Sequence, residues 1–189
     1  NGKIVKSVPE KTSKIIDASG LTVFPGGVDI HSHIAGSEVN IGRMIRPEDH
    51  EKDVVRKTAL TRSGVGYSIP STFTTGYRYS RLGYTTVMNP SMAALGAKHT
   101  HEELNDIPMI DKATFPLLGD WWLVLENISK GDLEACAMHV AWILEMTKGY
   151  AIKIVNPGGL ESWGFGRNVH SIDDQIPNFG LTPRDIMCG

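Results

Sequence analysis

Segments with the character of β-strands alternate along this 189-residue chain with segments that have the period of an α-helix. The alternating segments lie at residues 27–31, 84–89, 100–104, 121–125, 132–148 and 150–155. Those at 100–104 and 132–148 are helical, and in the second Cys136, Val140 and Ile143 fall on one apolar stripe. Strands that alternate with helices favour βα units around a parallel sheet, so we predict an α/β fold.

The length of the chain limits how much of a closed barrel it can form. Each βαβ unit needs about 30 residues or more, and a closed (β/α)8 barrel typically needs about 250. The four predicted strands use up the chain, so we expect at most half of a TIM-like barrel. We also expect the chain to be truncated at both ends. Residues 3–8 alternate like a strand without its partner, and Thr182, Pro183 and Asp185 have the pattern of a helix N-terminus.

The composition is typical of one globular domain and argues against several classes of function. The chain is 41% hydrophobic and 21% charged, and its net charge of −2 provides no electrostatic footprint for nucleic acid or an anionic membrane. No apolar run approaches the roughly 20 residues of a membrane-spanning helix. Cys136 and Cys188 match neither a disulfide framework nor a zinc ribbon, so we expect a reducing, cytoplasmic location.

His31 and His33 stand two residues apart where the first predicted barrel strand ends. Side chains two residues apart in an extended strand leave the backbone on one face, so both imidazoles can meet a single metal ion. Asp29 shares that face. A His-x-His pair is common by chance. The apolar, β-prone residues 21–24 and the bend at Pro25-Gly26-Gly27 nevertheless favour a metal site here.

A second His-x-His pair, His99 and His101, has a different context. Thr100 followed by Glu103 has the pattern of a capping box, which places both histidines at the start of a helix. Residues there do not share a strand face, so we expect no direct metal role for this pair.

Lys153 is a single cation inside the short apolar run at 150–155. A buried, unpaired ammonium is costly, so such a lysine is usually paired, deprotonated or chemically modified. Reaction of its amine with CO2 would turn it into an anionic ligand able to bridge two metals. The alternative is an edge strand from which Lys153 faces solvent, and the run itself does not decide between the two.

The stretch Pro25-Gly26-Gly27-Val28-Asp29-Ile30-His31-Ser32-His33 resembles the opening signature of the amidohydrolase superfamily, in which a His-x-His pair follows barrel strand one. Four further stretches are similar to the family of A-type formylmethanofuran dehydrogenase subunits, and together they extend the similarity over nearly the whole chain: 42–50, 70–76, 83–88 and 99–103.

This resemblance implies a (β/α)8 barrel preceded by a small β-sandwich, with residues 1–24 in the sandwich and 25–189 forming the first half of the barrel. It also implies two Zn²⁺ ions at the C-terminal face of the barrel. His31 and His33 match the histidines of the first metal, and Lys153 matches an N6-carboxylysine that bridges both. The remaining metal histidines and the catalytic aspartate are expected beyond residue 189, so we expect no catalytic residue within the chain.

The implied reaction interconverts formate plus methanofuran with N-formylmethanofuran in one-carbon metabolism. The implied partners are other subunits of the complex, which carry a tungsten- or molybdenum-pterin and iron–sulfur clusters. Two alternatives stay open. One is another amidohydrolase, such as a dihydropyrimidinase-like cyclic amidase, and the other is a metal-free scaffold subunit.

Overall fold

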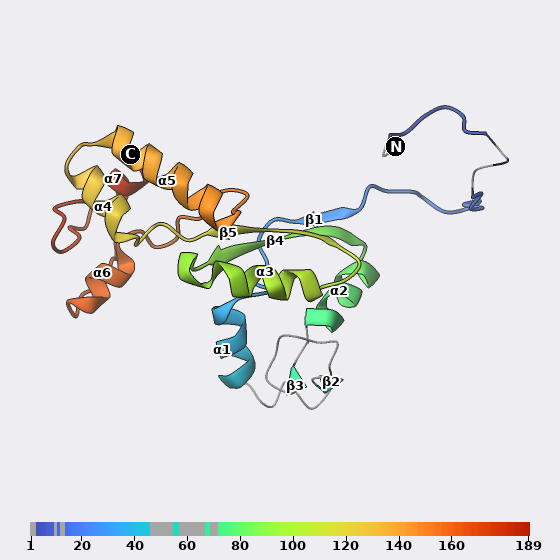
Figure 1. Ribbon diagram of the computed structural model, residues 1–189, viewed down its shortest axis with the longest axis horizontal. Helices are drawn as coiled ribbons and strands as arrows, with labels where there is room; N and C mark the ends of the chain where they lie inside the picture. The colour runs from blue at the N-terminus through green and yellow to red at the C-terminus, as the bar shows by residue number, and fades with distance from the viewer. Residues whose placement is uncertain (1–2, 10, 12–13, 46–54, 57–66, 69–71) are drawn as a thin grey trace.

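The computed structural model describes residues 3–9, 11, 14–45, 55–56, 67–68 and 72–189 (Figure 1). A three-stranded sheet forms the centre, and helices α4 to α7 gather at the end of the molecule opposite the N-terminal arm (Figure 1). The strands are β1 Gly27–Asp29, β2 Val55–Arg56, β3 Tyr67–Ser68, β4 Tyr84–Met92 and β5 Asp111–Pro116. The helices are α1 Ser37–Ile45, α2 Thr72–Arg81, the 3₁₀ helix η3 Ala94–Gly96, α3 Ala97–Asp106, α4 Trp122–Ser129, α5 Leu133–Thr147, α6 Gly159–Gly164 and α7 Pro183–Cys188.

The central sheet is parallel, as the alternation of strands and helices predicted. Its order is β1-β4-β5, and β4 pairs in parallel with both neighbours. The central strand begins with the β-prone run Tyr84-Thr85-Thr86-Val87, and Val87 is fully buried between the two edge strands. Strands β2 and β3 form a separate antiparallel pair. The α/β class is therefore confirmed.

The strand predicted at residues 121–125 is wrong, because this segment begins helix α4. Val124 and Leu125 are adjacent and both buried, whereas Trp122 and Leu123 are exposed, a pattern that fits one face of a helix and not an alternating strand. The third strand of the sheet is instead β5, which the sequence analysis missed. Its short stretch Lys112-Ala113-Thr114-Phe115-Pro116 has little of the apolar character used to find strands.

The segment predicted as a strand at 150–155 is present as a single parallel bridge between Lys153 and Leu117, the residue that follows β5. The structure therefore places this segment beside β5, on the side away from β4. The segment comes after β5 in the chain and lies next to it, in the position of a fourth strand of the sheet.

The predicted helices are confirmed, with clear local causes for their ends. Helix α5 begins after Asp132, whose carboxylate accepts the N–H of Ala135 at 3.0 Å, and ends at Lys148 in the left-handed conformation. Helix α7 begins with the predicted capping box, in which the side chains and backbones of Thr182 and Asp185 bind each other reciprocally.

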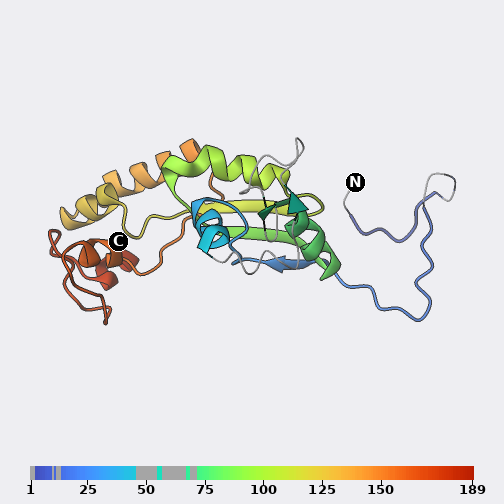
Figure 2. The same ribbon diagram turned by 90° about the horizontal axis from the view of Figure 1, so that it is seen from below.

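One apolar cluster joins the loop after β1 to the sheet and to α3. It contains Ile34, Ala35, Val87, Leu104, Ile107 and Ile110. Figure 2 shows α3 lying along one side of the sheet. The loop that follows the His31–His33 pair is thus part of the core.

The N-terminal arm extends away from the sheet in both views (Figures 1 and 2). The described residues before Gly27 contain no strand, so the strand predicted at 3–8 is not seen. Within the part of the chain that the structure describes, no helix combines the length and apolar character needed to cross a bilayer.

Candidate metal centre

His31 and His33 lie side by side just after β1. The carboxylate of Asp29 accepts the backbone N–H of His31 at 3.0 Å, and the N–H of Ser32 donates to the carbonyl of Met88 at 3.1 Å. These bonds hold the pair against β4. The two imidazole centroids are 5.7 Å apart with the rings at 72°, and both side chains are exposed.

The backbone of Lys153 is tied to the chain around the end of β5. Its N–H donates to the carbonyl of Pro116 at 2.9 Å, and its carbonyl accepts the N–H of Leu118 at 3.0 Å. Its neighbours Ile152 and Ile154 both line an apolar pocket formed with α4, α5 and α7. Because side chains alternate along an extended segment, Lys153 faces the other way.

The side chain of Lys153 reaches His31. Its Nζ atom lies 3.3 Å from Nδ1 of His31, and the residue is half-buried. The structure thus brings together two of the three residues predicted from the sequence, and His33 adjoins them through its ring contact with His31.

Sheet curvature is needed for this contact. The segment of Lys153 is separated from β1 by β4 and β5, and three steps at the usual strand spacing place it about 14 Å away in a flat sheet. The 3.3 Å contact therefore requires a sheet that curls toward His31 as well as a long lysine side chain. Curling of parallel strands in this way is what barrel closure demands.

Tyr79 of α2 also contacts the segment that carries His31 and His33. Its hydroxyl donates to Oδ2 of Asp29 at 3.2 Å and also contacts the hydroxyl of Ser32. Burial raises the pKa of Tyr79, so its hydroxyl keeps its proton across the neutral range. Asp29 and Ser32 are thus both tied to α2 through Tyr79.

The capping box predicted at Thr100 and Glu103 is wrong. Helix α3 already begins at Ala97, and the hydroxyl of Thr100 donates to the carbonyl of Gly96 at 3.1 Å. The carboxylate of Glu103 is fully buried and accepts the N–H of Gly36 at 2.6 Å. A long-range partner therefore replaces the local one that the pattern suggested.

The second histidine pair, His99 and His101, contacts other residues than the first pair. His99 lies 3.2 Å from the Glu103 carboxylate, and Nε2 of His101 lies 2.8 Å from the carbonyl of Thr147. Both histidines sit in the first turns of α3, as predicted, and neither is brought to His31. Across the described residues, no group of three or more His, Cys, Asp or Glu side chains is arranged to hold a metal.

Asp120 is a further acidic residue close to the end of β5. Its Oδ1 accepts the N–H of Leu160 at 2.9 Å, and burial raises the pKa of this carboxyl although backbone hydrogen bonds oppose the shift. Asp120 thereby holds the first turn of α6. No local pattern in the sequence points to this contact, because the two residues are forty positions apart.

The sequence profile of the amidohydrolase family matches residues 14–188. The chain belongs to the amidohydrolase family. This confirms the family predicted from the motif around His31 and His33. The match includes the segment of His31 and His33 and the segment that carries Lys153.

Two curated relatives align along almost the whole chain. It is 56% identical over 189 residues to Protein FwdA of Methanocaldococcus jannaschii, covering all of this chain and 33% of the relative. It is 33% identical over 188 residues to the A-type subunit of the formyltransferase/hydrolase complex Fhc of Methylorubrum extorquens, covering 99% of this chain and 34% of the relative. The chain thus spans about one third of the length of the curated relatives it matches.

A solved structure is also similar to this chain. It is the formyltransferase/hydrolase complex FhcABCD from Methylorubrum extorquens with methylofuran, and one of its chains superposes with a TM-score of 0.73 at 34% identity. The superposition covers 86% of this chain and 29% of the other.

Proposed function

We propose that this chain belongs to an A-type formylmethanofuran dehydrogenase subunit. In that role it takes part in a formyl-amide hydrolase and formyltransferase that interconverts formate plus methanofuran with N-formylmethanofuran. The similarity to Protein FwdA and to the A-type Fhc protein supports this proposal, as does the solved relative with methylofuran bound. The observation that carries it is the 56% identity to Protein FwdA over the whole chain.

The residues at this position fit a zinc centre. Imidazole nitrogens and carboxylate oxygens are ordinary zinc ligands, whereas a free ammonium is not. In the carboxylated form that we propose, the ammonium of Lys153 first loses one proton, and the neutral Nζ then forms a bond to the carbon of CO2 and loses a second proton. The resulting carboxylate lies beside His31, where it replaces the amine as a metal-binding group.

Each residue then has a defined part in the centre. His31 and His33 would hold the first of two zinc ions, and carboxylated Lys153 would bridge both. When bound, zinc supplies Lewis acidity that lowers the pKa of a water molecule and polarises an amide carbonyl. Asp29 accepts the backbone N–H of His31, and Tyr79 in turn donates its hydroxyl to Asp29. The further metal histidines and a catalytic aspartate are proposed to lie beyond residue 189.

The proposal extends to the surrounding architecture. Residues 25–189 would form the first half of a (β/α)8 barrel, and residues 1–24 would contribute to a β-sandwich. The curl of the sheet between β1 and Lys153 supports the barrel. The expected partners are other subunits of a cytoplasmic complex that hold the tungsten- or molybdenum-pterin and the iron–sulfur clusters.

The decisive experiment measures metal in the complete gene product that contains this chain. We expect two zinc ions per polypeptide and a Lys153 peptide heavier by one CO2 in native mass spectrometry. Lys153→Met should lower zinc affinity by more than about 100-fold, the upper end of the cost of losing a residue that merely supports a ligand. Lys148→Met is the matched control, because Lys148 is an exposed lysine paired with Glu145. Zinc-free protein with unmodified Lys153 would instead indicate a scaffold subunit.

Substrate specificity separates the proposed activity from its closest alternative. The complete gene product, with its partner subunits, should release formate from N-formylmethanofuran and leave dihydrouracil intact. Hydrolysis of the cyclic amide without turnover of N-formylmethanofuran would indicate a dihydropyrimidinase-like enzyme.

A further inference from the structure

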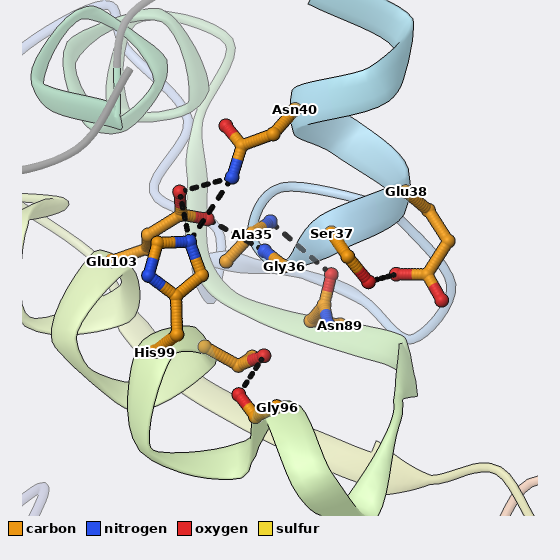
Figure 3. A network of polar contacts seen from close by, with 10 residues as sticks. Ala35, Gly36, Ser37, Glu38, Asn40, Asn89, Gly96, His99 and Glu103 are labelled. Atoms are coloured by element: carbon orange, nitrogen blue, oxygen red, sulfur yellow. Dashed lines mark hydrogen bonds and ion pairs between the residues drawn. The ribbon is translucent and has the colours of Figure 1, made fainter. Parts of the chain in front are cut away.

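The loop immediately after His33 is held by two buried side chains from other elements. The backbone N–H groups of Ile34 and Ala35 both donate to Oδ1 of Asn89, at 3.0 and 3.3 Å. The next N–H, that of Gly36, donates to Oε2 of Glu103 at 2.6 Å (Figure 3). Three successive N–H groups are therefore satisfied by side chains, where a regular element would use backbone carbonyls.

Asn89 is locked in the orientation that presents its oxygen to the loop. It is fully buried in the central strand β4, and its amide nitrogen donates to the carbonyl of Ser91 at 3.0 Å and to the hydroxyl of Thr114 at 3.2 Å. The same hydroxyl donates to the backbone carbonyl of Asn89 at 3.0 Å. All hydrogen-bonding positions of the amide are in use, so the side chain has no alternative rotamer of similar energy.

Glu103 forms the second anchor, from α3. Its Oε1 accepts the amide N–H of Asn40 at 2.6 Å and lies 3.2 Å from Nε2 of His99 (Figure 3). Gly36 itself has φ of +99°, a conformation that side-chain-bearing residues rarely adopt. The loop thus turns at one defined point between His33 and α1.

This arrangement matters because Asp29 and Met88 hold the backbone at His31 and Ser32, whereas Asn89 and Glu103 hold the backbone that follows His33. His31 contacts both His33 and Lys153, and ligands must be held within about 0.5 Å of their productive positions for tight binding. We propose that Asn89 and Glu103 are positioning residues, which fix the backbone after His33 and thereby the geometry of the metal-binding histidines. This inference rests on the proposed zinc centre.

The test compares metal binding in variants of the complete gene product. Asn89→Ala and Glu103→Ala should each weaken zinc binding by about 10-fold or more, the range found when residues that orient ligands are lost. Glu103→Gln keeps an acceptor for Gly36 and should recover most of the affinity. Glu102→Ala is the matched control, because this neighbouring glutamate is exposed.

A second control separates positioning from general destabilisation. Thr147→Val removes a buried hydrogen bond at 2.7 Å in α5, far along the chain from the histidine pair. It should lower the melting temperature without altering the visible spectrum of the cobalt-substituted protein, whereas Asn89→Ala and Glu103→Ala should alter that spectrum.

The outcomes distinguish this inference from the proposed function. Absence of metal from the wild-type protein overturns both. Metal-loaded wild type with unchanged affinity and cobalt spectrum in both alanine variants overturns the positioning role alone. Loss of affinity with a changed spectrum, together with recovery in Glu103→Gln, supports it.

Discussion

Truncation of Ile143 tests whether helix α5 sets the position of the segment that carries Lys153. Ile143 is fully buried and packs with Leu118 and Ala94, which belong to different elements. Leu118 in turn donates its backbone N–H to the carbonyl of Lys153. A cavity at Ile143 would therefore open directly beneath the lysine segment.

The expected cost follows from the buried volume. Ile143→Ala removes three carbon groups, worth about 2.4 kcal/mol at about 0.8 kcal/mol for each. The cavity adds to this cost, because walls contributed by separate elements collapse only partly, and the measured range for such truncations is about 2–5 kcal/mol. We therefore expect a loss of about 3–4 kcal/mol in the free energy of unfolding, a large part of the roughly 5–15 kcal/mol typical of a domain.

Urea denaturation followed by circular dichroism measures this loss. At a slope of about 2–3 kcal/mol per molar urea, the midpoint should fall by about 1–2 M. Met146→Ala is the control, since Met146 lies on the same helix and is 46% exposed. A shift for Ile143→Ala no larger than that for Met146→Ala would refute the assigned packing of α5.

Three further predictions concern other parts of the chain. Gly76→Ala should destabilise the protein by about 1–3 kcal/mol in the same assay, because the new Cβ would lie 2.0 Å from the carbonyl oxygen of Pro108. Gly164→Ala, where the Cβ meets no atom within 4 Å, should instead stabilise it by about 0.5–1 kcal/mol; equal effects at both positions would contradict the packing. Exposed Cys188 should react quickly with a thiol reagent at neutral pH, whereas Cys136 should react only on unfolding, because burial raises its pKa and disfavours the thiolate. Two fast thiols in the folded chain would argue against this burial. The 189-residue chain made alone should neither bind two zinc ions tightly nor release formate from N-formylmethanofuran, and turnover by this chain would show that the ligands expected beyond residue 189 are dispensable.

Local patterns in the sequence were sufficient for much of the fold. The apolar stripe and the flanking Asp132 and Lys148 define α5, and Thr182 with Asp185 defines the start of α7. These features depend on neighbours within a few residues, so their energies are already present in the isolated segment. The same is true of His31 and His33, whose spacing and position after a strand are local properties.

Tertiary structure decided the features that join distant segments. The run at 121–125 is apolar enough for either a strand or a helix, and only its packing against α5 makes it helical. The contact of Lys153 with His31 is likewise a tertiary feature, because it joins residues from two distant segments of the chain. Glu103 matched a local cap but binds Gly36, sixty-seven residues away in the chain.

The sequence by itself therefore determined the α/β class, the well-capped helices and the histidine pair. The placement of Lys153 beside His31 and the anchoring of the loop by Asn89 and Glu103 came only from the tertiary structure. The physical reason is that periodicity and capping are energies between near neighbours. The partner of a buried charge or amide is instead set by sheet register and curvature, which no short segment contains.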